Sequence, residues 1–361
     1  MDRKHILILG GAGFIGSNVA DHCLQEGRAV WVLDNMSRPG VERNLRWLRE
    51  RHGERLRIDV ADTRDLFAVR RAVRDASEVF HFAAQVAVTH SLHSPFHDFD
   101  VNARGTLHVL EALRELETPP PLVFTSTREV YGGLKGLELA VRGRRYTPMD
   151  DHTLAHGISE ACPLDFESPY GCSKGAADQY VLDYARTFGL PTVVFRMSCI
   201  YGPRQSGTED QAWVAHLLQR ALDGEPLTFH GDGMQVRDLL YVEDLVRAFR
   251  SAQQAMPRIQ GRAFNIGGGP GQTVSLLELL PLIQRCTGNA PRVAFEDWRA
   301  GDPRYYVSDT RAFTRATGWM PRVGVVEGVA RLGRWLEAQR AGRTRQAVGR
   351  EETLDAADSP P

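Results

Sequence analysis

The sequence has few lysines and no long apolar run, and its charges nearly balance. Only three of the 44 basic residues are lysines (Lys4, Lys135 and Lys174), and the other 41 are arginines. The formal net charge of −1 gives no overall attraction to nucleic acid or to an anionic membrane, so we expect neither partner. No apolar run approaches the roughly 20 residues that span a bilayer, so we expect no membrane segment.

Cysteine is also scarce. The five cysteines include no CxxC pair, which argues against a disulfide framework and against a zinc site. His90, His93 and His97 lie close together in the sequence, but no thiol or HExxH-type partner accompanies them, so we expect no metal. The first four residues lead directly into the apolar segment 5–9, unlike a signal peptide. These features predict a soluble protein of the cytoplasm.

Strand-like and helix-like segments alternate through the first half of the chain. The apolar segments that predict buried strands are 6–9, 29–33, 56–58, 79–82, 122–125 and 192–195. The predicted helices between them include 13–25, 65–73, 101–115 and about 169–188. This repeated β-α-β order predicts an α/β fold with a doubly wound parallel sheet, covered by helices on both faces.

The regular alternation ends after Met197, where glycine and proline interrupt the pattern. We therefore expect a sheet domain and a smaller, irregular α/β lobe. The predicted sheet domain is 1–196, with 236–262 returning to it, and the predicted lobe is 197–235 together with 263–340. Residues 341–361 are polar and lack periodicity, which predicts a disordered tail.

A glycine-rich turn follows the first predicted strand. The segment 10–16 reads GGAGFIG and leads directly into a helix, where glycines allow the backbone to approach a pyrophosphate closely. Asp34 ends the second predicted strand and suits the ribose hydroxyls of NAD better than the 2′-phosphate of NADP, although Arg38 lies nearby. Asp59 and Val60 suit the adenine edge. The alternative for the segment 10–16 is a glycine turn that binds no ligand. The alternative for Asp59 is an ordinary aspartate at the end of a strand.

A tyrosine and a lysine lie four residues apart at the start of the helix 169–188. Ser168 and Pro169 are a good N-cap and a good first helical residue, so Tyr170 and Lys174 share one face. A neighbouring ammonium favours the phenolate, which makes such a pair useful as an acid and base. This spacing alone also fits a solvated helix face. Lysine is so rare here, however, that a lysine at this position favours the catalytic interpretation.

Thr127 ends the strand-like segment before Arg128 and Glu129. Its hydroxyl is placed to hydrogen-bond a substrate oxygen beside Tyr170, and the alternative is an ordinary polar strand end. The sequence thus predicts Thr127, Tyr170 and Lys174 as catalytic residues.

Together these motifs resemble the extended short-chain dehydrogenase/reductases that act on nucleotide sugars. The resemblance covers residues 5–336 and includes HFAA at 81–84, Val101-Asn102 and VRDLLYVED at 236–244. It implies NAD bound in a Rossmann domain, a nucleotide sugar held by the smaller lobe, and a homodimer or homotetramer. The residues then expected to contact the cofactor are Gly10, Gly13, Phe14, Ile15, Gly16, Asp34, Asn35, Asp59, Val60, Ala83, Gln85, Tyr170 and Lys174.

Within this family the chain most resembles the subfamily of CDP-paratose (CDP-tyvelose) 2-epimerases. The similarity lies in QVA at 85–87, RYT at 145–147, the segments 164–180 and 210–214, and the 43-residue separation of Thr127 from Tyr170. It implies an NAD-dependent epimerase that oxidises and re-reduces the sugar. The resemblance implies that the substrate is held by Gln85, Arg128, Glu129, Arg204, Arg237 and Arg304.

Three other functions stay open. One is a UDP-sugar 4-epimerase, and a second is an NDP-sugar 4,6-dehydratase. Dehydratases of the family resemble STDEVYG at the active-site strand, whereas Arg128 here replaces the Asp that would act as general acid. The third is a regulatory module that binds NAD without turnover, although such a module has no need of Thr127, Tyr170 and Lys174.

Overall fold

The structure is a computed structural model that describes residues 5–208, 211–299 and 301–357, with side chains up to residue 341. Its centre is a sheet of seven parallel strands in the order β12-β8-β5-β4-β1-β2-β3. The strands are β1 (His5–Leu9), β2 (Ala29–Asp34), β3 (Leu56–Val60), β4 (Ala76–His81), β5 (Leu122–Thr127), β8 (Thr192–Met197) and β12 (Arg262–Ile266).

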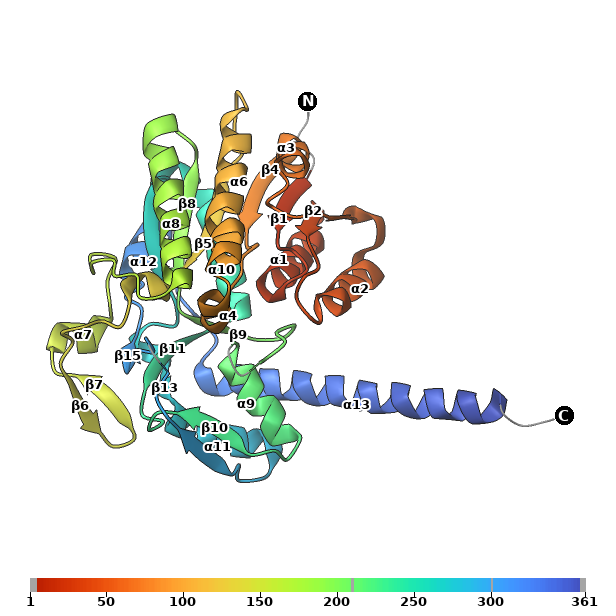
Figure 1. Ribbon diagram of the computed structural model, residues 1–361, viewed down its shortest axis with the longest axis vertical. Helices are drawn as coiled ribbons and strands as arrows, with labels where there is room; N and C mark the ends of the chain where they lie inside the picture. Colours follow the sequence, from red (N-terminus) through yellow and green to blue (C-terminus); the bar gives the residue numbers. More distant parts are fainter. Residues whose placement is uncertain (1–4, 209–210, 300, 358–361) are drawn as a thin grey trace.

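Helices cover both faces of this sheet (Figure 1). Successive side chains of a strand point to opposite faces, so in β1 Ile6 and Ile8 enter one core, and Leu7 and Leu9 enter the other. One face packs against α1 (Phe14–Gln25), α2 (Val41–His52), α10 (Val242–Ile259) and α12 (Arg311–Thr317). The other packs against α3 (Leu66–Arg74), α6 (Gly105–Arg114) and α8 (Pro169–Phe188). The predicted doubly wound α/β fold is confirmed.

A smaller lobe lies beyond the carboxyl ends of the strands (Figure 1). Three helices of this lobe pack with strand side chains around a third core that includes Leu218, Phe229 and Leu279. The lobe contains β9 (Cys199–Tyr201), α9 (Trp213–Leu222), β10 (Leu227–His230), β11 (Val236–Tyr241), β13 (Thr273–Ser275), α11 (Leu276–Thr287), β14 (Val293–Glu296), β15 (Tyr305–Tyr306) and α13 (Val325–Ala357).

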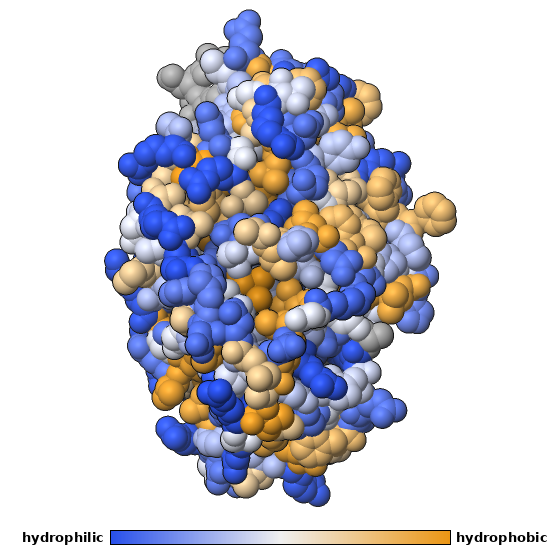
Figure 2. All heavy atoms as spheres, turned by 90° about the vertical axis from the view of Figure 1, so that its left-hand side faces the viewer, coloured by the Kyte–Doolittle hydropathy of each residue, from blue (hydrophilic) through white to orange (hydrophobic). Residues whose placement is uncertain are grey.

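Shorter elements complete the described part of the chain. They are α4 (Val88–His93), α5 (Pro95–Phe99), a π-helical turn (Asp100–Arg104), the hairpin β6 (Leu139–Arg142) and β7 (Arg145–Pro148), α7 (Asp151–His156), and single 3₁₀ turns at Gly53–Arg55, Arg128–Tyr131 and Pro270–Gln272. All five cysteines are free thiols. No helix in the described residues is long and apolar enough to cross a membrane. Hydrophobic and hydrophilic side chains intermingle over the face in Figure 2.

The chain crosses between the sheet domain and the smaller lobe at positions that differ from the predicted boundaries. β11 (236–241) belongs to the smaller sheet, whereas β12 (262–266) returns to the edge of the large one. Phe264 and Ile266 of β12 are buried in the first core, which fixes this return.

The tail also differs from the prediction. α13 continues to Ala357, where the sequence predicts disorder over 341–361, and residues 358–361 lie outside the described part of the chain. Alanine, arginine and glutamate, all good helix formers, are frequent in this segment, so helix does not require an apolar stripe there.

Candidate active site

The turn between β1 and α1 is glycine-rich because side chains do not fit in it. Gly10 has a φ of 79°, and a Cβ there would lie 2.6 Å from the backbone nitrogen of Ala83. A Cβ on Gly16 would overlap the carbonyl oxygen of Gly10. Gly13 is the N-cap of α1 and makes no side-chain capping bond, so the helix N-terminus is open to an anion. This turn fits the pyrophosphate of a dinucleotide.

A cavity, here called the first pocket, begins at this turn. It is lined by Gly13, Phe14 and Ile15, and on its far side by Ser126 of β5 and Tyr170 of α8. The Ser126 hydroxyl is buried and has no hydrogen-bond partner among the described residues, so it is available to a bound group. Open helix N–H groups at one end and an unsatisfied hydroxyl at the other fit a dinucleotide such as NAD.

Asp34 supports the glycine-rich turn from the end of β2. Its carboxylate accepts hydrogen bonds from the backbone nitrogens of Ala12, at 3.0 Å, and Met36, at 2.9 Å. Burial raises the pKa of Asp34. The side chain does not line the first pocket, and the adjacent Asn35 donates to Asp62 at 2.7 Å.

The other two residues predicted for the adenine end lie at the end of β3. Asp59 forms ion pairs with Arg57 and Arg71, and Val60 is 70% exposed. Neither lines the first pocket.

Helix α8 places Tyr170 at the pocket. Ser168 caps the helix by accepting a hydrogen bond from the backbone nitrogen of Gly171 at 3.0 Å, and Pro169 is its first residue, as the sequence predicts. Tyr170 is buried and lines the first pocket together with Thr127 and Lys174. Burial raises the pKa of Tyr170, and a hydrogen bond with Thr127 opposes this rise.

Lys174 lies one turn further along α8. Its ammonium donates to the carbonyl oxygen of Thr125 at 2.6 Å and lies 4.3 Å from the ring centre of Phe124. Burial lowers the pKa of Lys174 to about 7, and the carboxylates of Asp178 and Asp98 oppose this shift.

A buried network fixes α8 against α5. Asp98 accepts hydrogen bonds from Gln85, at 2.6 Å, from Asn102, at 3.3 Å, and from Ser173. Gln85 also donates to the carbonyl oxygen of Ala87. The side chain of Gln85 is thus engaged within the protein, and neither it nor Ala83 lines the first pocket.

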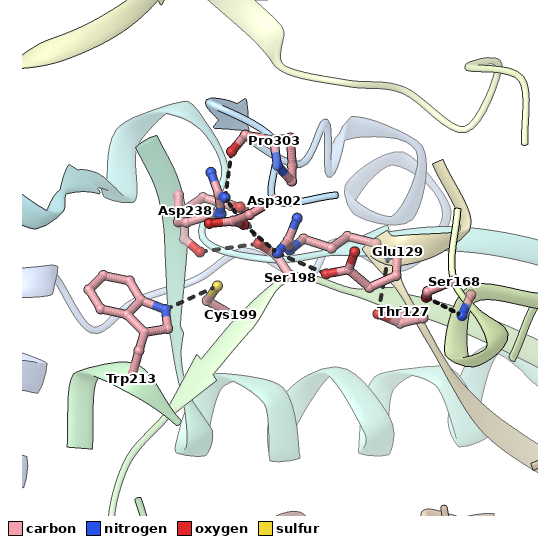
Figure 3. A network of polar contacts seen from close by, with 12 residues as sticks. Thr127, Glu129, Ser168, Ser198, Cys199, Trp213, Asp238, Asp302 and Pro303 are labelled. Carbon is pink, nitrogen blue, oxygen red and sulfur yellow. Dashed lines mark hydrogen bonds and ion pairs between the residues drawn. The ribbon is translucent and has the colours of Figure 1, made fainter. Parts of the chain in front are cut away.

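A second pocket adjoins the first, and Glu129 lines both. Arg128 lines it from the 3₁₀ turn after β5, Arg237 lines it from β11, and Asp302 lies between the two guanidinium groups. Arg128 lies 2.8 Å from Glu129 and 3.7 Å from Asp302, and Arg237 lies 2.5 Å from Asp302. Figure 3 shows this network, with Thr127, Glu129 and Asp302 labelled. The guanidinium groups hold the pKa of Asp302 below its usual value.

Two predicted substrate residues lie elsewhere. Arg204 lines the first pocket, with its guanidinium 3.5 Å from the ring centre of Trp47, so it does not lie beside Arg237. Arg304 lies near the rings of Tyr146 and Trp298 and does not line the second pocket. Because arginine is abundant throughout the chain, the basic character of a position could not show whether it lies in the second pocket.

Several side chains of the second pocket were not predicted from the sequence. They are Asp302, Arg299, Trp213 and His216. Trp213 and His216 come from α9, and Arg299 and Asp302 from the segment between β14 and β15, so distant parts of the sequence meet at this pocket.

A parallel sheet with a glycine-rich dinucleotide turn, next to a Tyr–Lys pair on a helix, defines an enzyme of the short-chain dehydrogenase/reductase type. The model of the NAD dependent epimerase/dehydratase family matches residues 6–267, and the chain belongs to this family.

Known relatives span nearly the whole chain. The chain is 41% identical to the CDP-paratose 2-epimerase of Salmonella typhi over 340 residues, which cover 92% of this chain and 99% of that protein. It is 31% identical to the dTDP-glucose 4,6-dehydratase of Neisseria gonorrhoeae, over 92% of this chain and 95% of that protein.

Solved structures share the fold. The crystal structure of the UDP-glucose 4-epimerase of Thermotoga maritima with UDP-glucose has a TM-score of 0.79 at 30% identity and covers 93% of this chain and 99% of its own. The UDP-glucose 4-epimerase of Thermus thermophilus, in complex with NAD, has a TM-score of 0.75 at 32% identity and covers 92% of this chain and 99% of its own.

Proposed function

We propose that the chain is an NAD-dependent CDP-paratose 2-epimerase. The single structural observation that carries the proposed redox epimerisation is the convergence of Thr127, Tyr170 and Lys174 on the pocket that begins at the glycine-rich turn. The choice of a CDP-linked sugar and of its C2 rests on the 41% identity to a CDP-paratose 2-epimerase.

The residues of the chain handle the proton of the reacting hydroxyl. Tyr170 accepts this proton as the sugar is oxidised and returns it as the sugar is reduced, while Thr127 orients the hydroxyl by a hydrogen bond. The Lys174 ammonium stabilises the phenolate electrostatically. The first pocket, with Gly13, Phe14 and Ile15 at the glycine-rich turn, would hold NAD⁺, which would supply a reversible hydride acceptor for the sugar carbon. Reorientation of the keto-sugar between the two transfers would expose its opposite face to the returning hydride.

The second pocket supports the binding of the nucleotide sugar. Its two guanidinium groups, Arg128 and Arg237, suit a diphosphate or sugar hydroxyls, and Glu129 adds a carboxylate between the two pockets. The arginine at position 128 is a poor general acid, because ion pairs with Glu129 and Asp302 raise its pKa despite burial. This disfavours elimination of water from the sugar.

UDP-sugar 4-epimerisation is the second candidate. It is favoured by the likeness to the Thermotoga maritima structure, which contains UDP-glucose. The two candidates differ in nucleobase and in reacting carbon, so one experiment separates them.

The experiment incubates the protein with CDP-, UDP-, GDP- and dTDP-sugars deuterated at C2 or C4. We expect inversion at C2 of the CDP-linked sugar, with the substrate deuterium retained and none taken up from deuterated buffer. Inversion at C4 of a UDP-sugar would replace the proposal by the second candidate. Uptake of solvent deuterium at the inverted carbon would contradict transient oxidation at that carbon.

We further propose that the enzyme is a homodimer or homotetramer that packs through helices of the sheet domain, including α8. Tyr180 and Phe188 of α8 are 45% and 46% exposed, and Phe96 and Phe99 of α5 are exposed nearby in the fold. Sedimentation velocity should show a dimer or tetramer, and Tyr180→Glu should shift it towards the monomer. A monomer at all concentrations would contradict this assembly.

A further inference from the structure

Residues 203–206 cross from the smaller lobe to the helices beside the glycine-rich turn. The side chain of Asn18 on α1 donates to the carbonyl oxygen of Pro203 at 3.1 Å. Asn44 on α2 donates to the carbonyl oxygens of Arg204, at 3.3 Å, and Ala12, at 3.1 Å. Asn44 thus ties the crossing segment to the turn itself. We call residues 203–206 the strap.

The centre of the strap is held in a conformation that arginine rarely adopts. Arg204 has a φ of 73°, which costs about 1 kcal/mol and persists only where the surroundings impose it. Its guanidinium stacks on Trp47 of α2 at 3.5 Å and lies 5.9 Å from the ring centre of Trp335 on α13. Aromatic rings from both lobes therefore fix this residue.

The strap forms one wall of the first pocket. Arg204, Gln205 and Ser206 line this pocket together with the start of α1. Asn18 and Trp47 do not line it, although they hold the strap from behind. Their effect on anything bound in the pocket must act through the strap.

We propose that Asn18 and Trp47 are positioning residues that hold the strap closed beside bound NAD, so that the cofactor stays in place through both hydride transfers. This inference rests on the proposed function, because an epimerase that returns the hydride to the same sugar must not lose its cofactor halfway. Loosening the strap should convert a tightly held cofactor into an exchanging one.

The test measures NAD release from the NAD-loaded, full-length protein, without any sugar. Labelled NAD is chased with excess unlabelled NAD in the parent chain and in Asn18→Ala and Trp47→Ala. Loss of one hydrogen bond or one cation–π contact should speed release roughly three- to tenfold in each variant. Trp47→Phe keeps a ring beneath Arg204 and should restore slow release.

Trp298→Ala is the matched control, since it removes a partly exposed tryptophan from the smaller lobe, away from the strap. It should release NAD at the parent rate. Unchanged NAD release in both Asn18→Ala and Trp47→Ala would overturn the inference. NAD release from Trp298→Ala or from Trp47→Phe as fast as from Trp47→Ala would also overturn it.

Thermal unfolding of each variant stripped of NAD separates misfolding from strap opening. A variant that unfolds like the parent chain but releases NAD faster supports the inference. This result does not depend on the experiment with nucleotide sugars. If no sugar is epimerised but NAD release still depends on the strap, the proposed epimerase is refuted and the inference about the strap stands.

Discussion

Burial disfavours the charged forms of both Tyr170 and Lys174. It raises the pKa of the phenol and lowers that of the ammonium to about 7. Each charged form is therefore costly in this buried site. The pair is therefore suited to hold a proton temporarily rather than to stay permanently ionised.

Tyr170→Phe removes the only atom of this side chain that can carry the proton. Turnover should fall at least 100-fold, the lower range for general acid–base catalysis. Bound NAD, measured by absorbance after denaturation, should be unchanged, because the ring still fills its site. Substantial residual turnover would contradict the role of Tyr170.

Lys174→Arg keeps the positive charge, which arginine supplies almost everywhere else in this chain. The ammonium fits between the Thr125 carbonyl and the Phe124 ring, and a planar guanidinium is too large for this buried site. Most activity should be lost in a steady-state assay with saturating NAD. Near-normal turnover would show that charge alone is sufficient.

His81 provides a pH test of stability. It is fully buried, and its Nε2 lies 3.0 Å from the hydroxyl of Thr106, which donates to the carbonyl oxygen of Asn102. Nε2 is therefore the donor, and burial lowers the pKa of His81 to about 3. Below the usual value of about 6.5, the unfolded chain binds a proton that the folded one does not, so stability falls as pH falls.

His81 should lower the free energy of unfolding by about 1.4 kcal/mol per pH unit below 6.5, or by about 2 kcal/mol from pH 7 to pH 5. His81→Gln keeps a donor but does not titrate. Urea unfolding at both pH values measures how far the free energy of unfolding falls from pH 7 to pH 5. This fall should be smaller in His81→Gln than in the parent chain by about that amount. Equal decreases in the two proteins would mean that His81 is not held neutral.

At the scale of elements, Asp98 joins α8 to α5 and to the segment at Gln85. Asp98→Ala removes a buried acceptor shared by three donors, at a cost of about 2–3 kcal/mol in the free energy of unfolding. Asp183→Ala, on the exposed side of α8, should cost less than about 0.5 kcal/mol. Urea unfolding of the two variants measures this difference. Equal costs would indicate that the network adds no stability.

Local patterns predicted the elements that carry the proposed chemistry. Short apolar runs predicted six of the strands in the large sheet, and Ser168-Pro169 predicted the start of α8, since both signals are encoded within a few residues. The positions of some elements and side chains in the folded protein were harder to predict. β12 contains Arg262 and Asn265, which obscured a buried strand, and the inward turn of Asp34 depends on backbone groups that the sequence does not reveal.

At the scale of the whole molecule, the polypeptide leaves the large sheet after β8, builds β9 to β11 and returns at β12. The two lobes are therefore joined by several connections. The ring of Tyr131, which follows β5, also packs against the ring of Tyr306 on β15 of the smaller lobe, with the ring centres 6.2 Å apart. We infer that the lobes unfold together.

A nucleotide bound in the second pocket should stabilise this single unit. CDP at 100 times its dissociation constant adds about 2.7 kcal/mol to the free energy of unfolding. The thermal midpoint of the NAD-loaded protein should rise more with CDP than with the same concentration of UDP. A larger rise with UDP would contradict the proposed preference for cytidine.

The scarcity of lysine has a practical consequence for chemical labelling. Lys174 is 3% exposed, whereas the side chain of Lys135 is 77% exposed and lies 2.6 Å from Glu167, which lines the second pocket. Lys4 lies outside the described residues. An amine-reactive dye applied to a Lys4→Arg variant would therefore attach mainly at Lys135 and the α-amino group. A fluorophore at Lys135 would lie beside Glu167 of the second pocket and would report in real time the binding of a nucleotide sugar there.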